Sequence, residues 1–100
     1  MNNNYHVLIA KDKNGVVAHC LEMDICGQGK TEDTAVKDLI IAIQEQIIFC
    51  SRNKVSVYRP APKEYWDKFY QSLIAALKSK PVDEKPLSRD IPSHLELAYA

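Results

Sequence analysis

The sequence lacks a surplus of charge of either sign, and it lacks any long apolar run. Lys plus Arg and Asp plus Glu number 13 each, so the formal net charge is zero. Affinity for nucleic acid grows with the number of phosphates that basic residues neutralise, and neither half of the chain carries a dense basic stripe. We therefore do not expect one chain to bind nucleic acid. No apolar run approaches the roughly 18 residues of a membrane-spanning helix, so no membrane partner is expected.

The cysteines do not follow a disulfide pattern. Cys20, Cys26 and Cys50 are odd in number and irregularly spaced, which excludes a disulfide framework. Residues 1–4 have neither the basic start nor the apolar core of a secretion signal. The sequence therefore predicts a cytoplasmic protein with reduced thiols.

One hundred residues suffice for one domain with a modest core. Residues 5–10 are apolar with β-branched members, which predicts a strand. The polar residues 11–15 end in Asn-Gly, a strong hairpin signal, so residues 16–21 are expected to return antiparallel. Residues 25–29 predict a short third strand, whose glycines indicate a sheet edge or a bulge.

Two helices and a fourth strand are predicted next. Thr31 is suited to cap a helix over residues 32–50, in which apolar side chains recur at helical spacing. Residues 54–58 alternate between polar and apolar, which predicts a strand. A second helix, rich in aromatic side chains, is predicted over about residues 62–80.

The remaining residues, 81–100, are predicted to form an extended tail because three prolines interrupt them. Leu95, Leu97 and Tyr99 alternate with other residues, which suits a short strand only where another segment supplies a sheet edge. We therefore predict an α+β fold with a single domain over residues 1–80. Its small antiparallel sheet, in the order β-β-β-α-β-α, is packed by the long first helix.

No arrangement of polar residues completes a catalytic or metal site. A ribonuclease-H-type metal site needs a carboxylate inside the first strand, and residues 5–10 contain none. His19 and Cys20 are adjacent on a strand, so they point to opposite faces and cannot share a site. A phosphate-binding loop ending in Lys30-Thr31 would require glycine where Asp24 stands. We expect a non-enzymatic protein with no catalytic residue, no metal and no cofactor.

Two helical surfaces carry more apolar side chains than a core requires. Ile41 and Ile48 lie seven residues apart on the wet face of the first helix. The aromatic stripe of the second helix is too wide for one contact face. The alternating residues 95–99 offer a third apolar surface, which is not helical. We predict partner or oligomer contacts at these positions: Ile41, Ile48, Trp66, Tyr70, Leu95, Leu97 and Tyr99.

The middle of this sequence resembles a known family. Residues 17–25 (VAHCLEMDI) are followed by residues 27–31 (GQGKT) and by Ala35 early in a helix. In order and spacing this resembles the HicB-like antitoxin family, over about residues 5–50. The resemblance implies a partial ribonuclease-H-like fold. It also implies a role in neutralising a small toxin ribonuclease by direct binding, usually as a dimer or larger assembly.

Two departures from the family bear on this interpretation. Family members often have Glu where Thr34 stands, so no capping box is expected at the first helix. Many members add a C-terminal DNA-binding segment, which residues 59–100 do not resemble. The favoured hypothesis is a protein-binding module that blocks a toxin sterically. The alternatives are a stand-alone homo-oligomer with a structural or ligand-binding role, and a single-stranded RNA binder that stacks bases on Tyr65, Trp66 and Tyr70.

Overall fold

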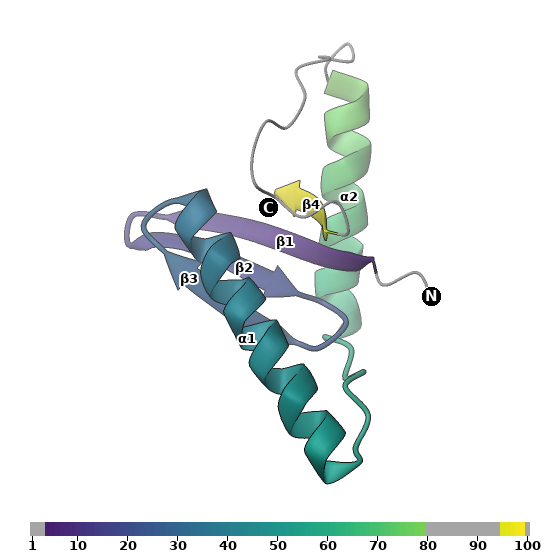
Figure 1. Cartoon of the computed structure of the whole chain (residues 1–100). Coiled ribbons are helices and arrows are strands. Elements are labelled where there is room, and N and C mark those ends of the chain that lie inside the picture. The colour runs from purple at the N-terminus through teal and green to yellow at the C-terminus, as the bar shows by residue number, and fades with distance from the viewer. Residues whose placement is uncertain (1–3, 80–94, 100) are drawn as a thin grey trace.

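Four strands and two helices make up the part of the chain that the computed structural model describes, residues 4–79 and 95–99 (Figure 1). The predicted α+β class is confirmed. The elements are β1 (Tyr5–Asp12), β2 (Gly15–Cys20), β3 (Ile25–Gly29), α1 (Glu32–Asn53), α2 (Lys63–Ser79) and β4 (Leu95–Tyr99). Neither helix in these ranges is long and apolar enough to cross a bilayer.

The sheet has the strand order β3-β2-β1-β4. The hairpin predicted from Asn14-Gly15 joins β1 to β2, and the Asp12 carboxylate accepts the N–H groups of Asn14 (2.7 Å) and Gly15 (3.1 Å). β3 pairs antiparallel with β2 and lies at an edge, as its glycines indicated. Gly15 has a positive φ of 145°, which explains why the turn needs glycine there.

The prediction of an all-antiparallel sheet with a free tail is wrong at one edge. β4 pairs with β1 in parallel, and Leu95 lies opposite Tyr5 in the register. The chain's own first strand thus supplies the sheet edge that the alternating residues required. The rest of the predicted tail, residues 81–94 and 100, lies outside the described residues.

The ends of α1 correct two further predictions. Thr34 preserves a capping box that was not expected, because its hydroxyl accepts the Thr31 N–H (3.1 Å) while the Thr31 hydroxyl accepts the Thr34 N–H (3.2 Å). At the other end, Lys54 adopts a left-handed conformation with φ 55°. The Val55 N–H then donates to the Cys50 carbonyl (3.0 Å), which closes the helix. Residues 54–58 therefore form a helix terminus and loop, and no strand.

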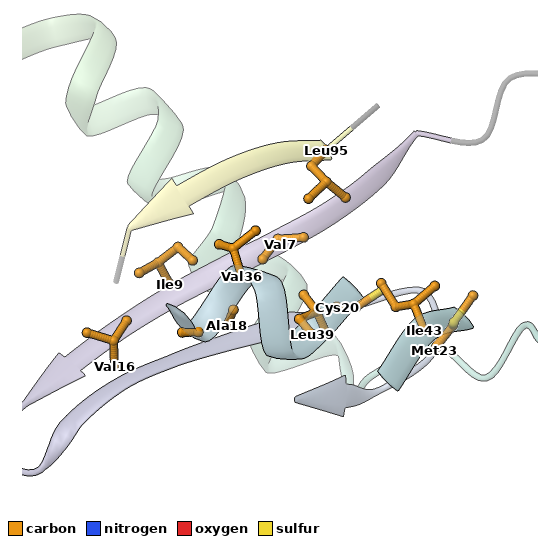
Figure 2. Packing of buried hydrophobic residues seen from close by; sticks show 11 residues of the cluster. Val7, Ile9, Val16, Ala18, Cys20, Met23, Val36, Leu39, Ile43 and Leu95 are labelled. Atoms are coloured by element: carbon orange, nitrogen blue, oxygen red, sulfur yellow. The ribbon is translucent and has the colours of Figure 1, made fainter. Parts of the chain in front are cut away.

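The two helices cover opposite faces of the sheet (Figure 1). On the α1 face, Val36, Leu39 and Ile43 pack over the strand residues Val7 and Ala18 (Figure 2). On the α2 face, Phe69 is fully buried against Leu8, Leu21 and Ala98. Each face of the sheet therefore has a core of its own, and each helix protrudes beyond the sheet at one end (Figure 1).

Candidate functional site

A groove lies beside α2, on the sheet face that this helix covers only in part. α2 packs against β4 and β1, which leaves the neighbouring surface of β2 and β3 open. The groove has a volume of about 410 Å³. Leu8, Ala10 and Val17 form its apolar floor. Its rim consists of His19, Asp24 and Cys26 from the strands and the β2–β3 bend, with Tyr65 and Lys68 from α2.

The groove brings together an imidazole, a carboxylate and a thiol. His19 Nε2 lies 2.7 Å from Asp24 Oδ1, and Cys26 is the residue directly opposite His19 in the β2–β3 ladder. The edge of the His19 ring meets the Tyr65 ring at a centroid distance of 4.9 Å. Because an ionised carboxylate can only accept a hydrogen bond, Nε2 carries the hydrogen and donates this bond to Asp24 Oδ1. Histidine is thereby held in one orientation, as in many hydrolytic sites.

The thiols of Cys20 and Cys26 are nevertheless not activated as nucleophiles, because the pKa of each is raised. Burial, and secondarily the Asp24 carboxylate, raise the pKa of the exposed Cys26 thiol above its ordinary value. Burial raises the pKa of the Cys20 thiol to about 11. A cysteine nucleophile requires a lowered pKa, because the thiolate is the reactive form. Both thiols therefore remain protonated at neutral pH.

This thiol chemistry yields a direct prediction. Cys26 is exposed, whereas Cys20 and Cys50 are buried, so we expect one fast-reacting thiol per native chain in a titration with a chromogenic disulfide. Its rate at pH 7.5 should be several-fold below that of a free cysteine, and it should rise as pH increases. Asp24→Asn should raise the rate about two- to threefold, since it removes one of the two causes of the high pKa.

Asn tolerates the positive φ of 54° at position 24, so this variant keeps the backbone intact. Cys26→Ser serves as the control, which should remove the fast phase entirely. A rate that Asp24→Asn leaves unchanged would show that the carboxylate has no electrostatic influence on the thiol.

Trp66 and Tyr70, two of the predicted contact residues, pack around a second histidine. The His6 ring lies within 5.4 Å of the Trp66 ring and 6.2 Å of the Tyr70 ring, measured between centroids. One oxygen of the Glu22 carboxylate accepts a hydrogen bond from the His6 backbone N–H (2.8 Å). The other oxygen lies 2.5 Å from Nδ1 of the His6 ring. Trp66 is half-buried, and Tyr70 remains exposed. Much of the aromatic stripe is thus explained by contacts within the chain.

The predicted residues at the C-terminal strand are also engaged within the chain. Leu95 is buried in the core on the α1 face, and Leu97 packs against the same core. The Tyr99 hydroxyl donates to the Glu32 carboxylate (2.7 Å). Among residues 4–79 and 95–99, no three acidic, cysteine or histidine side chains gather closely enough to hold a metal ion.

Ile41 and Ile48 lie where the sequence places them, on the exposed side of α1. Their side chains are 55% and 51% exposed. Phe49, which the sequence interpretation missed, is 56% exposed on the same helix. The signal for it was present, because residues 47–49 form an unbroken apolar triplet, and three consecutive helix positions cannot all face one core.

A second cleft, of about 630 Å³, lies between the β1–β2 turn and the start of α1. Lys11, Lys13 and Lys30 line it, which suggests an anion site. Asp12 and Glu32 line it too, and their carboxylates neutralise much of this positive charge. The cleft therefore carries no distinct preference for a phosphate group.

Comparisons with known proteins identify no relative. No family model matches the chain, and no curated protein and no solved structure matches it.

Proposed function

We propose that this chain is a non-enzymatic protein-binding module of the HicB type, which blocks a small toxin ribonuclease by covering it. Two observations support the proposal. The sequence of residues 5–50 resembles that family, whose members bind such toxins directly. The groove beside α2 offers an apolar floor and a polar rim, which is the architecture of a pocket that receives an anchor side chain from a protein partner.

The groove is the main structural support for this proposal, because it can receive a side chain of the partner. An aliphatic or aromatic side chain entering it would displace water from Leu8, Ala10 and Val17, which favours binding in proportion to the apolar area covered. The rim would then pair with polar groups of the partner, because Lys68 offers donors and Asp24 keeps one carboxylate oxygen beyond its bond to His19. The protonated thiol of Cys26 adds apolar contact rather than reactivity.

The RNA-binding alternative receives less support from the geometry. Stacking requires free aromatic faces beside basic groups. Trp66 packs against His6, and Lys63 is paired with Asp67 at 3.2 Å. A cytoplasmic location remains part of the proposal, since a toxin ribonuclease acts on cytoplasmic RNA.

The proposal is tested with two variants that fill the groove, Ala10→Arg and Cys26→Arg. Both positions are exposed, so folding should be preserved. The first step is to search the gene's neighbourhood for a short reading frame that encodes a small basic protein, and its product is the partner to use. We expect wild type to form a stoichiometric complex with it in titration calorimetry and to inhibit its RNA cleavage, and each variant to weaken the complex about 100-fold or more.

Gln71→Arg is the matched control, because it adds the same side chain at an exposed position on α2 that does not line the groove. It should bind like wild type. An unchanged affinity of both groove variants would remove the groove from the interface. A neighbouring protein that neither binds nor cleaves RNA would contradict the toxin-neutralising role itself.

A further inference from the structure

The two edges of the sheet are protected to different degrees. At the β3 edge, α1 packs against the strand, and the Asp38 carboxylate accepts the N–H of Gln28 (2.9 Å). β4, at the opposite edge, contains neither lysine nor proline, the residues that commonly prevent a further strand from pairing. Among residues 4–79 and 95–99, no strand pairs with β4 on the side away from β1. The β4 edge is therefore open within this part of the chain.

The backbone of Leu97 points towards this open edge. The Leu21 N–H donates to the His6 carbonyl (2.9 Å), so His6 bonds towards β2 and its neighbour Val7 bonds towards β4. In a parallel pair a residue bonds to the residues on either side of its partner, and the partner of Val7 is Leu97. The N–H and the carbonyl of Leu97 consequently point away from β1, as do those of Leu95. Strand addition uses such a row of backbone groups.

α2 crosses the strands at a steep angle and continues past β4 (Figure 1). Tyr65 meets His19 of β2, at 4.9 Å between the ring centroids. One turn later, Phe69 packs over Leu8 of β1 and Ala98 of β4. A helix turn rises about 5.4 Å and neighbouring strands lie about 4.8 Å apart, so each turn of α2 passes at least one strand. Because α2 continues from Phe69 to Ser79, its last turns lie above the position that a fifth strand would take beside β4.

The overhanging part of α2 presents apolar groups towards this position. Ala76 follows Phe69 by about two helical turns and so projects from the same side of the helix. Leu73 lies between them on that side, and it is only half-buried against the cluster around Phe69. Ala76 is exposed. A strand added to β4 would therefore have an apolar cover already in place on one side.

We infer that the β4 edge binds an extended peptide segment of a partner protein, which pairs with Leu97 as a fifth strand beneath the end of α2. On the α2 face, this segment would lie beside Glu96 and Ala98 of β4. The exposed carboxylate of Glu96 favours Lys or Arg opposite it. Ala98 is small, which favours a large apolar side chain opposite it, in contact with Leu73 and Ala76. The segment thus carries a basic and a large apolar residue two positions apart.

A segment of another protein fits this edge better than a second copy of this chain. The β4 strand of a second copy brings its own α2 on the same face, whereas the overhang of α2 fits a strand that has no helix there. None of the residues that would contact the segment lines the groove beside α2. The β4 edge is therefore a second interaction surface, additional to the groove of the proposed function.

The β4 edge is tested with a displayed library of random peptides of about ten residues, selected on the full chain. Enriched peptides should alternate, with Lys or Arg two positions from a large apolar residue. Amide hydrogen exchange followed by nuclear magnetic resonance should show that the bound peptide slows exchange at Leu97 about tenfold or more. A selection that enriches no peptide, or a peptide that protects the Cys26 amide of the β3 edge instead, would show that the inference is wrong.

Two neighbouring alanines of α2 provide a matched pair of variants. Ala76→Glu should weaken binding of the enriched peptide about tenfold or more, because it puts a carboxylate against the apolar side chain of the peptide. Ala75→Glu adds the same charge about 100° around the helix, turned away from β4, and should leave the affinity unchanged. Both alanines are exposed, so both variants should fold. The groove variant Ala10→Arg should also bind the peptide like wild type, which separates this edge from the groove.

A charge exchange tests the predicted basic residue. Glu96→Lys should weaken the enriched peptide several-fold, and replacing the basic residue of the peptide by Glu should restore the affinity. Equal binding by Ala76→Glu and wild type, or a charge exchange without rescue, would contradict the inference. A wild-type dimer in which the Leu97 amide is already protected would also overturn it, because a second copy would then occupy the edge.

Discussion

Gly27→Ala is expected to destabilise the protein by about 3 kcal/mol or more, because α1 lies directly on the backbone of β3 at this point. A Cβ atom at position 27 would overlap the backbone nitrogen of Leu39 and lie 2.6 Å from the Ala35 carbonyl oxygen. Both atoms belong to the helix backbone, so no rotamer change relieves the overlap. The helix must move away, which opens the core between Leu39 and the sheet.

Urea unfolding monitored by circular dichroism checks this expectation, and the melting temperature should fall by roughly 10 to 20 °C. The neighbouring variant Gln28→Ala is the control. Its side chain is exposed, and the Gln28 N–H that donates to Asp38 (2.9 Å) is retained, so its stability should stay within about 0.5 kcal/mol of wild type. Equal stability of Gly27→Ala and wild type would mean that α1 lies farther from β3.

Signals within short stretches of the sequence predicted the first hairpin and both helices correctly. The Asn14-Gly15 turn fixes the first hairpin, and the helical spacing of apolar residues located both helices. The glycines of β3 were correctly associated with a sheet edge, but their main effect is different. Gly27 permits the close approach of α1, and this contact joins residues that only the folded chain brings together.

Non-local contacts explain the two strand errors. Val55 and Val57 alternate as strand residues do, yet the left-handed Lys54 ends α1 there and the free edges of the sheet lie elsewhere. The alternation of Leu95, Leu97 and Tyr99 is equally short, and here it does form a strand, because β1 offers a parallel edge. A five-residue alternation cannot by itself indicate whether such an edge exists.

The candidate site was harder to predict than the fold. His19 and Cys20 do point to opposite faces, as their adjacency predicted, since Cys20 lies in the core on the α1 face and His19 meets Tyr65 on the other. The pairing of His19 with Asp24 depends on the β2–β3 bend, and the groove depends on how far α2 covers the sheet. Neither leaves a recognisable spacing in the sequence.

Ala98→Asp is expected to cost about 3 kcal/mol or more, because it puts a carboxylate where β4, β1 and α2 meet. Ala98 is 2% exposed and packs with Leu8 and Phe69. Either β4 leaves the sheet, which opens the edge of β1, or the domain unfolds at a lower urea concentration. Amide hydrogen exchange separates these outcomes, since release of β4 alone should expose the β1 amides that bond to it while the α1 amides stay protected.

The control is Glu96→Ala on the same strand, whose side chain is exposed and whose change should be nearly neutral. If Ala98→Asp unfolds like Glu96→Ala, β4 adds little to the domain, and the C-terminal strand is then free to serve a partner instead of its own sheet.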